Sequence, residues 1–228
     1  MTEAEWLACD NPTQMVGYLR GNASDRKIRL LGSLCCRCHW HLLTDGRIRA
    51  AVEMAELWAD GLATEAQLEA AESAADQAKD DIIMDRCEID YSLKEFCINA
   101  ARAVSLLAGI SFDAERCVVV TGYCRVISFR EGLGNDLAVS EDRSLCAIVR
   151  DIFGNPFRPI AFSPEWRTDT AIALARTMYE SREFGAMPIL ADALQDAGCD
   201  NDDILSHCRG DGPHVRGCWV VDLVLGKT

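Results

Sequence analysis

Helix-start signals recur along this 228-residue chain, whereas hairpin signals are almost absent. Thr2–Glu5 and Thr64–Gln67 both fit the capping box, in which two side chains satisfy the free amides of a first helical turn. Ser140 and Ser163 have the character of N-caps, and Pro164 suits the first position of a helix because it lacks an N–H. These signals predict an all-α or mostly α chain.

Apolar residues with helical spacing fill the stretches between these signals. In the segment 25–42, Ile28, Leu31 and Cys35 share one face, while Arg29 and Arg37 lie elsewhere on the helical wheel. Similar patterns predict a multi-helix bundle in the N-terminal half and a C-terminal helical hairpin followed by a Cys/His-rich tail. The further helices are expected at 46–61, 65–81, 92–109, 173–184, 188–198 and 201–208.

Two stretches bear on the division into domains. The valines and isoleucines of 114–132 suit a strand as well as a helix, so a minor β element near 115–130 is an alternative there. The stretch 131–140, EGLGNDLAVS, has the glycines and the Asn-Asp pair of a linker. We therefore expect an N-terminal helical bundle over 1–135 and a C-terminal helical subdomain over 140–228, with one continuous domain as the alternative.

The charge balance and the first residues limit the classes of protein. Asp and Glu total 36 against 23 Lys and Arg, and a net charge of −13 disfavours binding to nucleic acid. The first residues lack the features of a signal peptide, and no apolar run is long enough to span a bilayer. We expect a cytoplasmic protein without a membrane segment. Its twelve cysteines are then interpreted as core residues or metal ligands, not as disulfides.

Several sequence blocks resemble a lineage-expanded, paralogous family of uncharacterised bacterial proteins. They are MTEAEWLACDNPTQM, SDRKIRLLGSLCCRCHWHLLTD, IFGNPFRP and ILADALQDAGCDNDDILSHCRGDGPHVRGCWVVDLVLGK. The resemblance covers both ends of the chain and implies no established activity. The family pattern maps onto Cys35, Cys36 and His41, whereas Cys38 and His39 depart from it. The C-x-x-C-H formed by these last two residues with Cys35 matches a haem-attachment motif, which the missing export signal argues against.

The window from Cys199 to Cys218 concentrates thiol and imidazole groups. It holds five of them, although twelve cysteines and four histidines in the whole chain would place about one or two in a window of that length. The spacing C-x8-C-x5-H-x3-C resembles that of CCCH zinc fingers, with the last two ligand types exchanged. The predicted ligands of a structural Zn²⁺ are Cys199, Cys208, His214 and Cys218, with Cys36, His41 and His207 as additional or replacement ligands.

Two considerations leave the ligand set open. If the stretch 201–208 is a regular helix, Cys199 and Cys208 lie roughly 13 Å apart, too far for one ion to bridge. Alternatively, Cys199 and Cys218 fill the core while His207 and His214 bond backbone groups.

The functional interpretation follows from these features. We expect an interaction or regulatory module whose partner is a protein of unknown identity, with the oligomeric state left open. The alternative is a thiol- or zinc-dependent enzyme of unknown substrate. The sequence contains no H-E-x-x-H, Walker A, Rossmann glycine triplet or nucleophile elbow that would favour a particular reaction.

Overall fold

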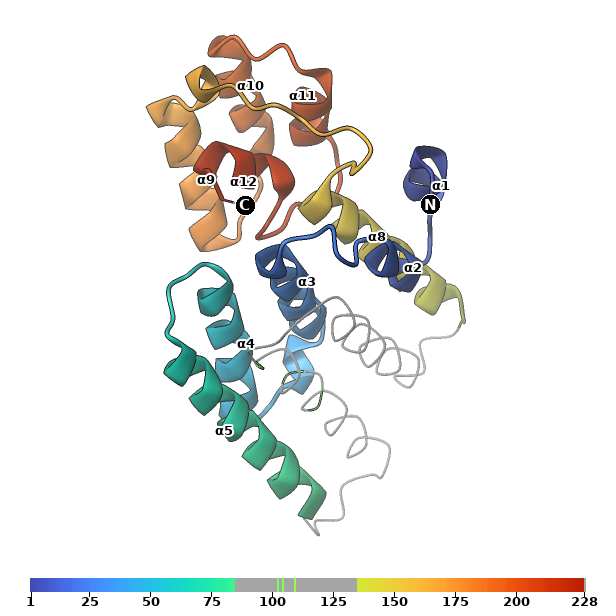
Figure 1. Ribbon diagram of the computed structural model, residues 1–228, viewed down its shortest axis with the longest axis vertical. Coiled ribbons are helices and arrows are strands. Elements are labelled where there is room, and N and C mark those ends of the chain that lie inside the picture. Colours follow the sequence, from blue (N-terminus) through green and yellow to red (C-terminus); the bar gives the residue numbers. More distant parts are fainter. Residues whose placement is uncertain (85–101, 103, 105–108, 110–134, 228) are drawn as a thin grey trace. The chain divides into compact units, whose positions relative to one another are not determined.

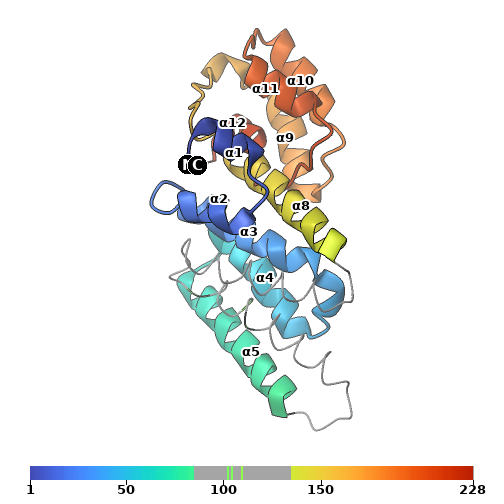
Figure 2. The ribbon, with the colours of Figure 1, turned by 90° about the vertical axis from the view of Figure 1, so that its right-hand side faces the viewer.

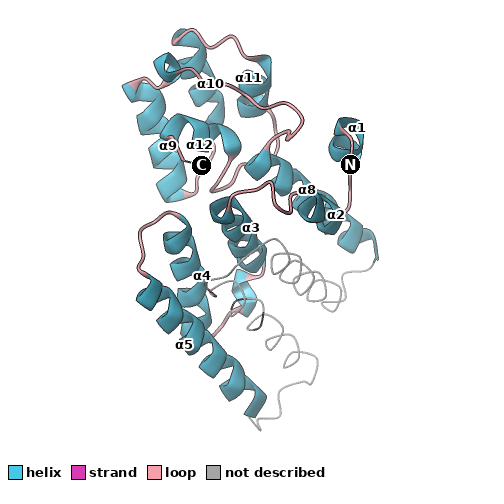
Figure 3. Cartoon of the chain, in the orientation of Figure 1, coloured by secondary structure: helices cyan, strands magenta, loops and turns pink. Residues whose placement is uncertain are grey.

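A computed structural model describes residues 1–84, 102, 104, 109 and 135–227 of the chain (Figure 1). These residues form ten α-helices and two short 3₁₀ helices, and no strand occurs among them (Figure 3). The all-α prediction is therefore confirmed for this part of the chain. The helix expected at 92–109, apart from three of its positions, and the alternative β element near 115–130 fall outside the described residues.

Local side-chain chemistry starts the helices where the sequence predicted. Helix α1 (Glu3–Ala8) has a complete capping box, because Glu5 N donates to Thr2 Oγ1 at 3.3 Å and Thr2 N donates to Glu5 Oε2 at 2.7 Å. The same reciprocal pair joins Thr64 and Gln67 before helix α5 (Glu65–Met84). Ser163 caps the 3₁₀ helix η2 (Pro164–Trp166), which confirms the third predicted start.

The fourth predicted start and part of the expected linker are wrong. Helix α8 (Asn135–Phe153) already includes residues 135–140, so Ser140 lies inside a helix and is no N-cap. Asn and Asp suit a first helical turn as well as a loop, and the following Leu-Ala favours helix, so the composition of this stretch was ambiguous. Residues 131–134 lie outside the described part. The division into 1–135 and 140–228 stays a prediction.

Contacts between residues divide the chain into two compact units. The central unit comprises residues 10–145, and the terminal unit comprises residues 1–9 together with 146–228. The first helix α1 therefore packs with the C-terminal part of the chain.

The central unit is built around helix α4 (Gly46–Ala59), which packs against both α3 (Asp25–Cys38) and α5. Helix α2 (Pro12–Tyr18) precedes them, and the 3₁₀ helix η1 (Trp40–Leu42) connects α3 to α4. Ile28, Leu31 and Cys35 of the apolar face predicted for α3 are buried, whereas Cys38, which the helical spacing also places on that face, is exposed. Arg29, which we placed off that face, is buried as well. The apolar side chains buried in these three helices include Ile28, Leu31, Cys35, Ile48, Val52, Leu68 and Ala75.

Two ion pairs join α3 to the C-terminal end of α4. Arg37 donates to both carboxylate oxygens of Glu56, at 2.6 and 2.8 Å, and the Glu56 side chain is buried. Near the start of α3, Arg26 Nε lies 3.1 Å from a carboxylate oxygen of Asp60, the C-cap of α4. Largely desolvated pairs, and the bidentate Arg37–Glu56 pair above all, fix the rotation of one helix against another more firmly than exposed pairs do.

The terminal unit places four helices around one apolar core (Figure 2). Helices α9 (Asp169–Ser181) and α10 (Met187–Asp196) contact each other, as expected for a helical hairpin, and α10 also contacts α11 (Asp202–Arg209). Helix α12 (Trp219–Leu225) packs on α9 and α11. The core side chains include Met178, Tyr179, Met187, Leu190, Leu194, Ile204, Cys208, Val220 and Val224.

No helix within the described residues is both long enough and apolar enough to cross a bilayer.

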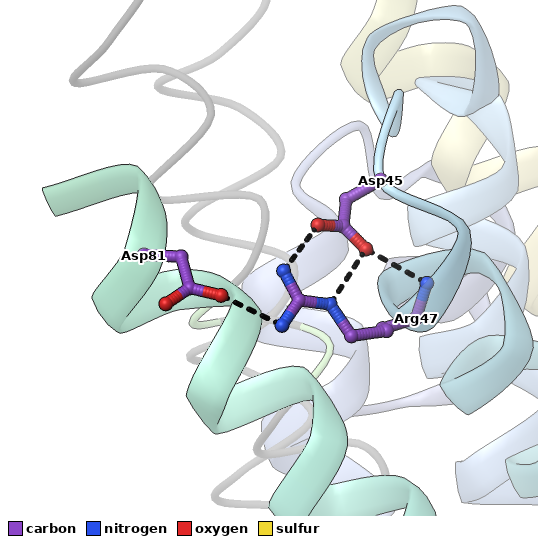
Figure 4. Close-up of polar contacts among 3 residues, drawn as sticks. All are labelled: Asp45, Arg47 and Asp81. Carbon is purple, nitrogen blue, oxygen red and sulfur yellow. Dashed lines mark hydrogen bonds and ion pairs between the residues drawn. The ribbon is translucent and has the colours of Figure 1, made fainter. Parts of the chain in front are cut away.

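An N-cap and an ion pair share one carboxylate at the start of α4 (Figure 4). Asp45 Oδ1 accepts from the backbone N–H of Arg47 at 2.8 Å, and the Arg47 guanidinium bonds both Asp45 and Asp81 of α5, each at 2.7 Å. The side-chain hydrogen bond from Arg47 is the main cause that lowers the pKa of Asp45 below its ordinary value of 3.8.

We predict that Asp45→Ala lowers the free energy of unfolding by about 1 kcal/mol, because the cap is lost. Asp45→Asn keeps a capping oxygen and loses only the ion pair, so it costs about 0.2–1 kcal/mol. A group whose folded pKa is depressed stabilises the fold above its unfolded pKa, so the difference between wild type and Asp45→Asn should disappear as the pH falls below 3.8. Urea unfolding at several pH values measures both effects. A difference that grows in acid contradicts this assignment.

Candidate metal centre

Four side chains with metal-binding atoms meet in the terminal unit, and we call them the Asp151 cluster. They are Asp151, His207, His214 and Cys218. Each offers one ligand atom, and the four atoms lie within 4.8 Å of one another. Asp151 lies near the end of α8, His207 lies on α11, and Cys218 immediately precedes α12, so three helices contribute to one point.

Local sequence places His207 at the edge of the buried face of α11. Asn201 caps this helix, with its Oδ1 accepting from Ile204 N at 3.0 Å. Ile204 and Cys208 are buried and fix the rotation of the helix. Because His207 follows Ile204 by three residues, its ring lies on nearly the same face and is only partly exposed. Gly210 ends the helix.

A tight turn brings the other two ligands of the tail together. Cys218 N donates to Val215 O at 2.9 Å, and Gly217, the third residue of this turn, has a left-handed φ of 94°. A type II turn requires such a φ, which glycine adopts without strain. The turn lies between His214 and Cys218 and explains why a spacing of four residues brings both side chains to the same place.

The Asp151 carboxylate is the centre of the cluster. Its Oδ1 lies 2.9 Å from His214 Nδ1 and 3.1 Å from His207 Nε2. Its Oδ2 accepts from the backbone N–H of Val215 at 2.9 Å. The fourth ligand lies beside this pair of contacts, because Cys218 Sγ is 3.2 Å from His207 Nε2. The carboxylate and the thiol therefore each lie within hydrogen-bonding distance of an imidazole.

Burial shapes the protonation of the two acidic ligands. The Asp151 side chain is 2% exposed. Burial alone would raise the pKa of Asp151, but hydrogen bonds from His207 and His214 outweigh it and hold the pKa below its usual range. Burial raises the pKa of the Cys218 thiol well above its ordinary value, with the Asp151 charge adding to this effect. The amides of Val220 and Val221, at the start of α12, act in the opposite direction and favour the thiolate.

The two imidazoles are held by packing as well as by Asp151. The rings of His207 and His214 contact edge to face with centroids 4.9 Å apart, and the Trp219 ring packs against His207 at 5.0 Å. His214 Nε2 is buried and has no hydrogen-bond partner among the described residues. A buried ring nitrogen without a partner is rare in folded proteins and marks a group whose polar contacts are incomplete.

The separations in the cluster are near those of a metal site. Zinc binds imidazole nitrogen and carboxylate oxygen at about 2.0–2.2 Å and thiolate sulfur at about 2.3 Å, so the ligand atoms of a tetrahedral site lie about 3.3–3.6 Å apart. Three separations in the cluster, of 2.9, 3.1 and 3.2 Å, are slightly shorter, and none of the others exceeds 4.8 Å. The four residues could therefore hold a metal ion.

The structure brings together only some of the ligands proposed from the sequence. His214 and Cys218 of the main set, and His207 of the replacement set, belong to the Asp151 cluster. Cys199 and Cys208 lie in the apolar core and are not among its four members.

The helix expected at 201–208 forms as α11, and Cys199 precedes its N-cap, Asn201. The two thiols are near enough to interact electrostatically: burial raises the pKa of Cys208 to about 12, with Cys199 contributing to the rise.

The two remaining replacement ligands lie in the central unit. Cys36 is buried on α3, and His41 is an exposed residue of η1. Cys35, the first residue of the haem-like motif, is buried on the same helix, while Cys38 at its end is exposed.

Asp151 is the ligand that sequence reasoning missed. It lies in the run CAIVRDIF, one residue before the buried Ile152 and three after the buried Ile148. A carboxylate on the apolar face of a helix is expensive to bury without a partner, so this position carried a signal for a buried polar site. The signal could not name the partners, which lie 56 or more residues further along the chain.

Thiol labelling under metal-free, native conditions should separate the cysteines by burial. We predict that iodoacetamide modifies Cys38 at least about ten times faster than Cys208 or Cys218, because only a thiolate in contact with solvent reacts readily. Peptide mapping by mass spectrometry over time measures each rate, and labelling in denaturant provides the control. Equal rates for Cys38 and Cys218 in the native protein would contradict the buried position of Cys218.

Comparisons of the chain with protein-family models, with curated proteins and with solved structures gave no match. The resemblance expected from the sequence blocks therefore stays untested. The four side chains of the Asp151 cluster, with their distances and burial, are the observations from which a function can be inferred.

Proposed function

We propose that the Asp151 cluster binds one structural Zn²⁺ and that the terminal unit is a metal-stabilised helical module for interaction or regulation. The observation that carries this proposal is the convergence of two imidazoles, a carboxylate and a thiol, with their ligand atoms within 4.8 Å of one another. These are the three ligand types that zinc binds in proteins. Zinc would join α8, α11 and the start of α12.

Charge supports a divalent ion at this place. With Asp151 ionised, Cys218 as thiolate and both histidines neutral, the ligands carry two negative charges, which Zn²⁺ neutralises. A buried site of zero net charge avoids the large cost of desolvating an unpaired ion. Zinc also deprotonates a coordinating thiol, which overcomes the raised pKa of Cys218.

The outer contacts are those of a metal site that holds its ligands in place. Val215 N fixes the Asp151 carboxylate through Oδ2, which leaves Oδ1 directed at the two histidines. Hydrogen bonds of this kind orient metal ligands and tune their basicity. Four protein ligands complete a tetrahedral zinc site and leave no position for a reacting water. This supports a structural role over catalysis.

The runner-up function, a thiol-dependent enzyme, is favoured by one specific observation. Asp151, His207 and Cys218 are the residue types of a nucleophile, a base and an orienting acid. In such a triad, however, one ring nitrogen bonds the nucleophile and the other bonds the acid. Here the same atom, His207 Nε2, faces both Cys218 and Asp151. With its thiol 0% exposed, Cys218 is also poorly placed to reach a substrate.

The net charge of the chain bears on the class of its partner. A net charge of −13 repels phosphate backbones, so a protein partner suits this chain better than nucleic acid. A cytoplasmic location remains a prediction from the sequence.

Metal analysis tests the proposal directly. We predict that protein purified without chelator carries about one equivalent of zinc. Removing the metal should lower the free energy of unfolding, by about 4 kcal/mol when free zinc had been a thousand times its Kd. Inductively coupled plasma mass spectrometry and chemical unfolding with and without chelator measure these quantities.

Matched variants then identify the ligands. Cys218→Ala and His207→Ala should each lose the metal, whereas Cys208→Ala and Cys199→Ala, which alter buried thiols outside the Asp151 cluster, should keep it. Folding of each variant is checked by circular dichroism. A metal-free wild-type protein whose unfolding is unaffected by added zinc would overturn the proposal. Loss of zinc in Cys208→Ala with retention in His207→Ala would favour the ligand set expected from the sequence.

A further inference from the structure

Helix α1 is attached to the end of α8 by specific polar contacts. Trp6 is fully buried, and its indole Nε1 donates to Gly154 O at 3.2 Å. In the other direction, the Arg150 guanidinium donates to Trp6 O at 2.9 Å and also to Cys9 O, which satisfies carbonyls at the C-terminal end of α1. Glu3 Oε1 accepts from Asn155 at 2.7 Å.

Gly154 lies between α1 and the first residue of α12. It ends α8 with a left-handed φ of 66°, and its N–H bonds Arg150 O. A methyl group at this position would be only 3.3 Å from Trp219 Cγ, so the indole ring of Trp219 packs directly on the glycine backbone. The carbonyl of the same residue accepts the Trp6 hydrogen bond. Gly154 is thus in contact with both tryptophans.

Trp219 extends this contact to the Asp151 cluster. Its ring packs against His207 with centroids 5.0 Å apart, and it follows Cys218 directly in the chain. Two of the four cluster residues therefore determine where the Trp219 ring lies. Trp6, Gly154, Trp219 and His207 form a continuous series of contacts within the terminal unit.

We propose that metal binding at the Asp151 cluster regulates the docking of α1, with Trp219 as the positioning residue that transmits the effect. This inference rests on the proposed function. The element with two states is the segment 1–9, which is either docked on Arg150 and Gly154 or released. An ion bound to His207 and Cys218 fixes the ring of His207, against which the Trp219 ring packs, and the backbone of Cys218, which directly precedes Trp219. It thereby holds the Trp219 ring against Gly154.

Without the ion, fewer contacts fix this arrangement. Asp151 still bonds the two histidines and Val215, but the Cys218 sulfur then has its 3.2 Å contact with His207 Nε2 in place of a metal–sulfur bond. A sulfur atom is a weak hydrogen-bonding group, so this contact ties the start of α12 less firmly than a metal–sulfur bond would. Release of α1 would expose the Trp6 side chain and the groups of α8 that it covers.

By thermodynamic linkage, the coupling between metal binding and the docking of α1 is reciprocal. If the metal favours the docked state of α1, docking of α1 must raise the affinity for the metal by the same factor. Couplings of this type in proteins are typically about 5- to 150-fold. Substitution of Trp6, which is not a ligand, should therefore change the affinity of the protein for the metal.

The first experiment uses the wild-type chain alone. Hydrogen–deuterium exchange of the peptide covering residues 1–9 is followed with zinc bound and after removal of zinc by a chelator. We expect exchange to be at least about ten-fold slower with zinc bound, because release of α1 becomes rarer. Exchange at the same rate in both states overturns the coupling.

The second experiment uses a matched pair of variants on α1. Trp6→Ala removes the buried indole, whereas Leu7→Ala truncates a neighbouring side chain that is 56% exposed. Zinc affinity is measured by competition with a fluorescent chelator, and helix content by circular dichroism. We expect Trp6→Ala to weaken zinc binding about ten-fold and Leu7→Ala to change it by less than about two-fold. Equal affinities for the two variants overturn the coupling, and the exchange measurement decides the question if Trp6→Ala fails to fold.

The outcomes separate the two proposals. Tight zinc binding with no effect on α1 rejects the coupling and leaves the structural zinc site intact. The absence of zinc binding in the wild-type protein rejects both.

Discussion

The buried carboxylate of Asp151 is the constraint around which the terminal unit is arranged. A carboxylate that is 2% exposed has to be compensated by donors, since an uncompensated buried charge costs several kcal/mol or more. Here the donors are the side chains of His207 and His214 and the backbone N–H of Val215, so one acidic group on α8 fixes both α11 and the loop that follows it. The apolar core of α9 to α12 provides most of the burial, whereas Asp151 determines how the tail is aligned with α8.

A bound metal ion would make the arrangement of the four side chains in the Asp151 cluster more rigid. Hydrogen bonds to a carboxylate tolerate small changes of angle and distance, whereas four zinc–ligand bonds require defined lengths and a tetrahedral arrangement. The same ion would connect α8, α11 and α12 and, through Trp219 and Gly154, reach α1. With such an ion, the cluster would stabilise the terminal unit and would also control whether α1 is docked.

Most helix starts were predictable because they depend on residues that are close in sequence. A capping box needs only the four residues from Thr2 to Glu5, and an N-cap such as Asn201 needs the amides two or three positions ahead. The errors arose where local chemistry is ambiguous or where packing overrides it. The turn-like composition of 135–140 is compatible with the first turns of α8, and Arg29 is buried although its charge suggested the exposed face of α3.

The candidate site likewise has one part that was predictable from the sequence and another that only the tertiary structure determined. The sequence alone identified the window from Cys199 to Cys218 and, within it, two members of the Asp151 cluster, His214 and Cys218. A short turn around Gly217 brings these two residues together independently of how the rest of the chain packs. Only the tertiary structure selected His207 over Cys208, since the rotation of α11 decides which side chain faces the core and which faces the cluster. It also placed Cys199, which precedes α11, in the apolar core. Only the tertiary structure supplied Asp151, because a contact between residues 63 positions apart depends on how α8 packs, and the spacing of residues along the sequence carries no information about that packing.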